Sequence, residues 1–167
     1  MLTPEIQAHL DQMNATPGPP AHEAGVGPQI RIGVGTSVPT WGGRFSDKPV
    51  EGLFTVRALS DGVVTFKGPM FRGGAVQLGP SACLEIDGVL IAVGSGKSQM
   101  LDRELFRFVG IEPEAMKVLV NKSSVHFRAD FAPIASHILV AKAPGPMAAD
   151  PADLPWTRLP ASMALQP

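Results

Sequence analysis

The sequence holds little of what a self-contained metal or disulfide site requires. It has one cysteine, Cys83, which excludes an internal disulfide framework. Its histidines form no HExxH motif, and none is spaced with Cys83 as metal ligands are. A catalytic zinc needs about three protein ligands that converge on one point. We therefore expect neither a catalytic residue nor a metal or other cofactor site within this chain.

Charge of one sign and long apolar runs are also scarce. The net charge is −1, so no basic excess exists to neutralise a phosphate backbone. No apolar run approaches the ~20 residues of a membrane span. Residues 1–13 lack the basic and apolar regions of a secretory leader. We expect no nucleic-acid partner, no membrane partner and a cytoplasmic location, which a single cysteine suits.

What is present is enough apolar material for one core. Apolar residues make up 44% of the 167 residues and charged residues 17%. Proline and glycine cluster near both ends of the chain. We therefore predict an N-terminal helix at Thr3–Met13 with a Pro/Gly-rich linker in residues 1–28, a core domain over residues 29–145, and an irregular Pro-rich tail over residues 146–167.

Two Asp-Gly pairs predict tight hairpins, because both residue types tolerate positive φ. Asp61-Gly62 separates the β-rich runs Leu53–Leu59 and Val63–Lys67. Asp87-Gly88 separates Ala82–Ile86 and Val89–Val93. Weaker patterns predict further strands at Ile30–Val38 and Ala75–Leu78.

The pattern changes in the second half of the chain. It predicts a short helix at Asp102–Val109, a buried strand at Met116–Val120, a helix from Ser123 to about Ala135 and a last strand at Ile138–Ala141. The crossovers are long enough for parallel pairing. The predicted class is α+β, with a mixed β-sheet built from hairpins followed by a strand-helix-strand-helix-strand segment.

The start of the second predicted helix could receive an anion. Its first N–H groups are unpaired and its dipole favours negative charge, while Lys122, Ser123 and His126 add a charge and hydrogen bonds. A serine N-cap beside an exposed lysine explains the same residues. Arg128 could serve the anion or form a surface pair. Both interpretations stay open.

Two other motifs are incomplete. Gly94-Ser95-Gly96-Lys97-Ser98 follows a predicted strand and imitates a phosphate loop, but Ile91 stands where the first glycine of GxxxxGK[ST] belongs. Ser123, His126 and Asp130 have the residue types of a nucleophilic triad, but no GxSxG elbow is present. A polar loop and a capping serine are the simpler interpretations.

Several ordered motifs between Thr55 and Gly145 carry a family resemblance. They are G-P-M-x-R-G from Gly68, L-G-P from Leu78, D-x-x-x-F-x-x-x-G-I from Asp102, K-S-x-x-H-F-R-A-x-F from Lys122, and the final Ala143-Pro144-Gly145. Together they resemble the carboxy-terminal domain of the microcystinase-C-like zinc metallopeptidases, the family of microcystin-degradation proteins.

The resemblance implies a two-domain cytoplasmic hydrolase. A larger amino-terminal domain would carry zinc on His, Asp and Glu ligands, and the zinc would polarise a peptide or amide carbonyl and activate water. The present domain would complete the substrate cleft. The residues implied to face that cleft, where they would hold a substrate carboxylate or carbonyl, are Lys122, Ser123, His126, Arg128, Ser98 and Gln99.

The sequence also departs from the family. The catalytic domain is absent, NATPGPPAHEAG replaces an expected Asp-Asn-Pro-Gly-Gly-Gly stretch, Gly96-Lys97 replaces adjacent arginines, and the tail lacks a basic, proline-rich ending. We expect hydrolysis only with the metal-binding domain supplied in cis or in trans. The alternative is a stand-alone small-anion binding module or a degenerate fragment. An apolar face left by the absent domain would let the isolated chain form a homo-oligomer.

Overall fold

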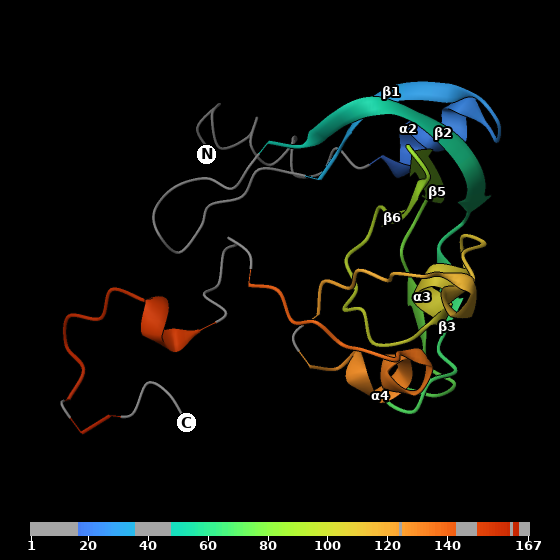
Figure 1. Cartoon of the computed structure of the whole chain (residues 1–167). Helices are drawn as coiled ribbons and strands as arrows, with labels where there is room; N and C mark the ends of the chain where they lie inside the picture. Colours follow the sequence, from blue (N-terminus) through green and yellow to red (C-terminus); the bar gives the residue numbers. More distant parts are fainter. Residues whose placement is uncertain (1–16, 36–47, 124, 143–149, 161, 164–167) are drawn as a thin grey trace, which may run out of the picture. The chain divides into compact units, whose positions relative to one another are not determined.

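The structure is a computed structural model that describes residues 17–35, 48–123, 125–142, 150–160 and 162–163. It divides into unit 1, Met1–Val34 with Val50–Ile138, and unit 2, Gly35–Pro49 with Leu139–Pro167. The predicted helix Thr3–Met13 lies outside the described residues. Figure 1 shows the described elements, which are α2 (Gly18–Ala24), β1 (Gln29–Val34), β2 (Val50–Ser60), β3 (Val63–Thr65), β4 (Ala75–Gln77), β5 (Ser81–Ile86), β6 (Val89–Gly94), α3 (Glu104–Arg107), α4 (Arg128–Phe131) and the 3-10 turns Pro113–Ala115, Ala132–Ile134 and Pro151–Asp153.

A four-stranded antiparallel sheet in the order β1-β2-β5-β6 forms the first half of unit 1. The β5–β6 hairpin confirms the prediction from Asp87-Gly88. Asp87 has φ 50° and Gly88 has φ 79°, the positive values that a two-residue hairpin turn requires. The predicted strand near Ile30 is confirmed as β1.

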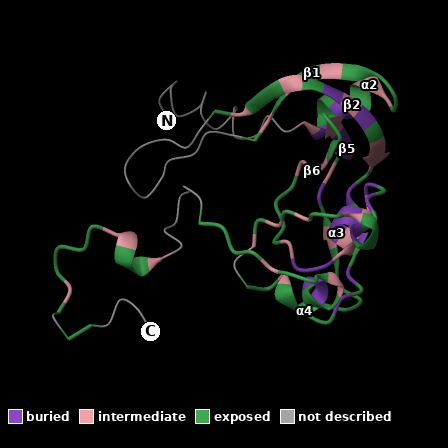
Figure 2. Ribbon diagram, in the orientation of Figure 1, coloured by how far each residue is buried: buried purple, intermediate pink, exposed green. Residues whose placement is uncertain are grey.

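Helix α2 covers one face of this sheet, and the sequence did not predict it. Pro19 and Pro20 belong to the predicted Pro/Gly-rich linker. Both lie in the first turn of α2, where a missing N–H costs no intrahelical bond. Ala21 of α2 is fully buried in a cluster with Phe54, Val56, Ala82, Leu84 and Val93. The Pro/Gly-rich stretch therefore forms part of the core (Figure 2).

The hairpin predicted at Asp61-Gly62 is wrong in its pairing. β2 already pairs with β1 and β5, so β3 instead pairs with β4 in a separate two-stranded sheet. Asp61 Oδ1 accepts a hydrogen bond from the Val63 N–H at 3.1 Å, an Asx-type turn that redirects the chain. The second sheet confirms the short strand predicted near Ala75.

Two apolar clusters pack α3 and α4 into unit 1. One joins β3 and the segment around Leu78 to α3, through Val64, Phe66, Leu78, Leu101 and Leu105. The other lies against Cys83, on the face of β5 opposite Ala82 and Leu84, and contains Phe106, Val109, Ile111 and Phe131. β5 is consequently buried on both faces.

The strand-helix-strand-helix-strand prediction is wrong in several parts. The short helix is confirmed as α3, but Met116–Val120 and Ile138–Ala141 pair with no described strand. The helix expected from Ser123 to about Ala135 begins only at Arg128, as α4, and continues as the 3-10 turn Ala132–Ile134, where Pro133 lacks the backbone donor that would extend the α-helix. All strand pairs among the described residues are antiparallel, so the α+β class is confirmed while the parallel part of the mixed sheet is not found.

None of the helices in the described ranges is long and apolar enough to cross a membrane.

Candidate functional site

Two buried carboxylates fix the positions of the loops that carry the candidate residues. Asp102 precedes α3, and its Oδ2 accepts a hydrogen bond from the Gly68 N–H at 2.6 Å. Its Oδ1 accepts one from the Glu104 N–H at 2.9 Å, which satisfies an otherwise unpaired donor at the start of α3. One side chain thus joins the Gly68 loop to α3.

Asp130 of α4 makes the second connection. Its Oδ2 accepts a hydrogen bond from the Arg103 backbone N–H at 2.7 Å, and its Oδ1 accepts one from Arg103 Nη2 at 3.1 Å. The hydrogen bond that the Arg103 guanidinium donates to Asp130 is the main cause that raises the pKa of Arg103. A buried carboxylate with a charged partner and a backbone donor is well compensated for its desolvation.

Gly68 is what lets the two carboxylates approach the same point. A Cβ at this position would lie 2.9 Å from Asp102 Oδ2 and 2.9 Å from Asp130 Cγ. We call Gly68, Asp102, Arg103 and Asp130 the carboxylate clamp. It draws together three motifs that are distant in the sequence: those beginning at Gly68, at Asp102 and at Lys122.

Sequence reasoning missed the clamp. The available signal was an acidic residue within each of two apolar patterns: Asp102 follows Leu101, and Asp130 lies between Phe127 and Phe131. An acid that is buried with such neighbours needs a charged or hydrogen-bonding partner.

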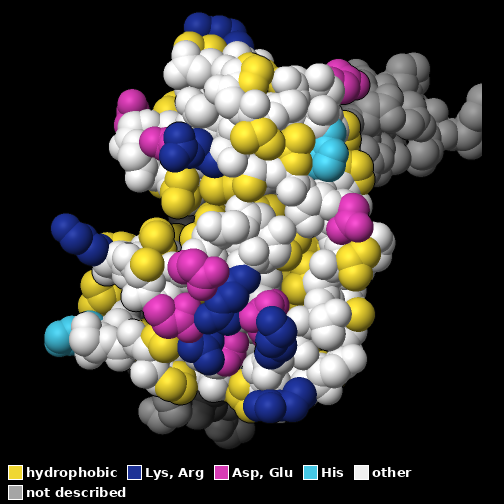
Figure 3. Space-filling view, turned by 90° about the vertical axis from the view of Figure 1, so that its right-hand side faces the viewer, with side chains coloured by type: hydrophobic (Ala, Val, Ile, Leu, Met, Phe, Trp, Pro, Cys, Tyr) yellow, Lys and Arg dark blue, Asp and Glu magenta, His cyan; other side chains and the backbone are white. Residues whose placement is uncertain are grey.

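A network of ion pairs continues from the clamp across the surface. Arg103 Nη1 lies 2.6 Å from Glu114 Oε1, and Arg107 Nη1 lies 2.9 Å from Glu104 Oε1. Burial opposes ionisation of Glu104, but hydrogen bonds from Lys67 and Arg107 outweigh it and lower the pKa of this carboxyl. Figure 3 shows Lys and Arg side chains interleaved with Asp and Glu side chains in one patch. Such a mutually neutralised patch is suited to holding elements together rather than to binding a charged ligand.

The predicted cleft-facing residues lie on two loops beside the clamp. Ser98 and Gln99 are exposed on the loop after β6, and Lys122, His126 and Arg128 are exposed around the start of α4. Met100 and Phe127, which adjoin these two groups in sequence, pack against the same apolar cluster. Across the described residues, no hydrogen bond or ion pair joins one group to the other, so their assembly into one cleft stays a prediction.

Ser123 does not cap a helix. α4 has four residues and its N-cap position is Phe127, so Ser123 lies before it. The Ser123 Oγ is shielded from solvent and has no hydrogen-bond partner. A single helical turn offers little dipole for an anion, which removes the physical basis of the predicted helix-terminus receptor.

The triad and the phosphate loop are not assembled either. Asp130 is engaged by Arg103 on both oxygens, which leaves His126 without the orienting carboxylate that a triad needs. In the loop after β6, the Gly96 N–H donates to the Leu78 carbonyl at 2.6 Å. The next helix, α3, begins only at Glu104. The polar-loop interpretation of this segment is the one that fits.

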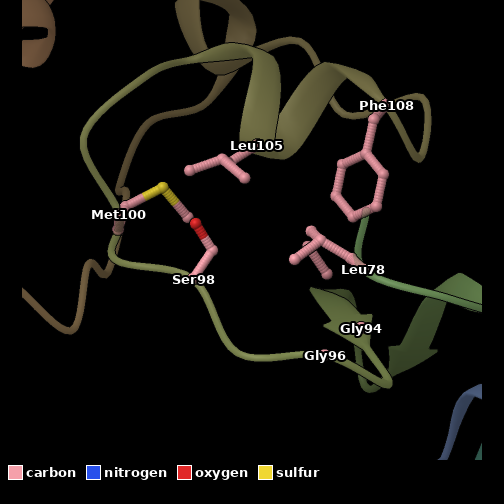
Figure 4. A pocket seen from close by; sticks show the side chains of 8 residues that line it. Leu78, Gly94, Gly96, Ser98, Met100, Leu105 and Phe108 are labelled. Atoms are coloured by element: carbon pink, nitrogen blue, oxygen red, sulfur yellow. The ribbon is translucent and has the colours of Figure 1, made fainter. Parts of the chain in front are cut away.

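A small pocket of about 130 Å³ lies beside the Ser98 loop. Figure 4 shows the side chains of Leu78, Met100, Leu105 and Phe108 converging on it, with Ser98 on the loop after Gly96. Its walls are mainly apolar, so the Ser98 hydroxyl is the polar side chain that a small guest would meet there.

The described residues contain no group of three or more His, Cys, Asp or Glu side chains placed to hold a metal ion. These described residues therefore offer no ligand set for a catalytic zinc, and no catalytic step through a metal is assigned to them.

Comparison with known proteins finds a family model and similar solved structures. Residues 19–158 match the family model described as MlrC C-terminus. A solved crystal structure from Mesorhizobium sp. BNC1, described as a "putative metallopeptidase", shares 29% sequence identity with a TM-score of 0.68. The similarity covers 84% of this chain and 27% of the Mesorhizobium chain, so this chain spans about a quarter of that protein's length. No curated protein matches.

Proposed function

Because its residues 19–158 match the family model, the chain belongs to the MlrC C-terminus family, and we propose that it is the cleft-completing domain of a zinc-dependent metallopeptidase or amidohydrolase. The family resemblance of the sequence is thereby confirmed. The metallopeptidase description of the Mesorhizobium protein supports the reaction class, namely hydrolysis of a peptide or amide bond.

The observation that carries the proposal is the difference in coverage. The similarity takes in 84% of this chain but 27% of the Mesorhizobium chain, which leaves most of that protein to supply further domains. A companion domain, in cis or in trans, would hold the zinc that the described residues do not fit. This chain would be inactive without that companion.

Within this proposal, the exposed residues of the two loops contact the substrate. Lys122 and Arg128 would hold a substrate carboxylate by charge-assisted hydrogen bonds. Ser98, Gln99 and His126 would hydrogen-bond its carbonyl and amide groups, and Ser123 could do so only after its shielded Oγ becomes accessible. The carboxylate clamp would fix the spacing of the loops, and preorganised donors of this kind raise affinity without a further ordering cost. Degradation of microcystin-type peptides is one reaction that the proposal covers, and a cytoplasmic location suits the single buried cysteine.

The alternative of a stand-alone anion-binding module has lost its main support. That hypothesis depended on a long helix beginning at Ser123, and the helix observed is one turn that begins at Arg128. An isolated lysine on an exposed loop is not a site of its own.

The test uses this chain co-expressed with the part of the Mesorhizobium metallopeptidase that it does not cover. Under the proposal the two polypeptides co-purify, the complex hydrolyses peptide substrates, and metal analysis finds zinc in the complex but no stoichiometric zinc in this chain alone. Stoichiometric zinc in the isolated chain would contradict the assignment of the zinc to the companion domain.

A variant series then tests the substrate contacts. Arg128→Ala and Lys122→Ala should each raise KM by roughly tenfold or more, the effect of losing one charge-assisted hydrogen bond. Arg31→Ala is the matched control, because Arg31 is exposed on β1 in the first sheet. Equal KM values for Arg128→Ala, Lys122→Ala and Arg31→Ala would remove the substrate role.

A further inference from the structure

The segment Lys117–Val120 is rich in residues that favour β-strands, but no described strand pairs with it. It belongs to no helix or strand, with a bend at Lys117, and Val118 and Val120 leave 78% and 85% of their surface exposed. In extended backbone these two side chains share one face, while Leu119 points to the other face, where it packs against the apolar cluster around Phe106 and Phe131. The segment is therefore anchored on one side and presents β-branched residues on the other.

The backbone of this segment is also unpaired among the described residues. Beside it, the Met116 N–H donates to Pro113 and the Ser123 N–H donates to Asn121. Between them no backbone hydrogen bond connects residues 117–120 to another described segment. A row of unpaired N–H and C=O groups in extended backbone is the edge to which another strand can add.

Two polar atoms that directly follow the segment lack partners. Asn121 Oδ1 and Ser123 Oγ are both shielded from solvent without a hydrogen bond. An unsatisfied buried polar atom costs about 1–3 kcal/mol. A shift of this loop that brought the two atoms to new partners would recover that cost.

We propose that residues 117–120 join the edge of a β-sheet in the companion domain by strand addition. The inference depends on the proposed function for its partner, since the uncovered part of the Mesorhizobium chain is long enough to contain a full domain. Main-chain hydrogen bonds provide the affinity in this mode, and the exposed valines fill pockets on the partner. The side-chain oxygens of Asn121 and Ser123 would gain hydrogen bonds only if the contact also shifts the loop that now shields them.

The proposed contact has a consequence for the candidate site. Residues 117–120 lead directly into Lys122, Ser123 and His126. Strand addition would therefore hold these side chains against the companion domain, in the cleft that the family resemblance implies.

The experiment measures hydrogen exchange of the chain alone and of its co-expressed complex with the uncovered part of the Mesorhizobium protein. The amides of residues 117–120 should exchange rapidly in the free chain and become protected in the complex. If the complex forms but these amides stay unprotected, strand addition by residues 117–120 is contradicted and the proposed function is not. The Mesorhizobium protein's own matching segment, co-expressed in the same way, is the positive control. If the control pair forms a complex but this chain does not bind the same partner, both the proposed function and strand addition are contradicted.

Variants test the mode of contact. Val118→Pro removes a backbone donor and Val118→Lys places a charge on the edge, and each should weaken the complex by roughly tenfold or more. Val118→Ala keeps the donor but leaves the partner's pocket unfilled, so it should weaken the complex less than Val118→Pro does. Val89→Lys, at an exposed valine of the paired strand β6, should bind within a few-fold of the original chain. Equal binding by Val118→Lys and Val89→Lys overturns the proposal. Concentration-dependent protection of residues 117–120 in the chain alone would also overturn it, because the occupant would then be a second copy.

Discussion

The Asp130 carboxylate binds Arg103 through both of its oxygens, at 2.7 Å to the backbone N–H and at 3.1 Å to Nη2. This relationship connects α4 to the residue that precedes α3. It makes the position of the loop that carries His126 and Lys122 depend on the position of the loop that carries Ser98. The first two predictions concern this connection.

Asp130→Asn should lower the free energy of unfolding by about 2 kcal/mol, because Arg103 loses the buried one of its two charged partners and one acceptor is replaced by a donor. Urea unfolding monitored by circular dichroism measures the loss. Asp87→Asn is the matched control and should be nearly neutral, because Asn also tolerates the φ of 50° at this turn. Equal effects of the two substitutions would contradict a structural role for the clamp.

Gly68→Ala should lower stability by about 1–3 kcal/mol, since its Cβ would overlap the two carboxylates and force them apart. The thermal midpoint measures this change. Gly94→Ala serves as control, because a Cβ there meets its nearest neighbour, Leu78 Cβ, at an ordinary 3.4 Å. If Gly68→Ala melts at the temperature of Gly94→Ala, the close approach described for the clamp is incorrect.

Glu104 should make stability depend on pH in the acidic range. Its pKa is lower in the folded than in the unfolded chain, so the ionised carboxylate stabilises the fold above the unfolded value of about 4.3. That contribution is lost as pH falls through the folded-state pKa. Glu104→Gln should therefore lose less stability on acidification than the original chain, and Lys67→Met should show an intermediate decline. Parallel curves for all three proteins would refute the assignment.

His22→Ala should loosen α2 from the first sheet. Nε2 of His22 lies 3.0 Å from the Ser60 carbonyl oxygen and 2.9 Å from the Ser81 carbonyl oxygen, and since both are acceptors the nitrogen must donate. We expect a loss of about 1 kcal/mol in urea unfolding. His137→Ala, at an exposed histidine, should cost less. The prediction fails if the two variants unfold at the same urea concentration.

Local signals in the sequence predicted the elements whose causes are local. Asp87-Gly88 predicted a hairpin because positive φ is a property of those two residues themselves. Gly110, three residues after the end of α3, also has positive φ, at 78°. The Asp61-Gly62 pair carried the same signal but joined two different sheets. Which strand becomes the neighbour of β2 is decided by long-range packing, which a dipeptide does not encode.

The candidate site was less predictable than the fold. Asp102 and Asp130 are separated by a long stretch of sequence and meet at Gly68 only after three clusters have packed. The failed strand prediction at Met116–Val120 has another cause. The residues do have strand propensity, but in the described part of the chain no strand lies beside them to pair with.

The chain passes from the first sheet to the second at Gly62, where two glycines lie in close contact. Gly62 and Gly79 both have positive φ, and a Cβ on Gly62 would lie 2.1 Å from the Gly79 carbonyl oxygen. Backbone thus touches backbone where one sheet gives way to the other. A side chain at position 62 would therefore force the two sheets apart at this crossing, whatever the packing of the apolar clusters around it.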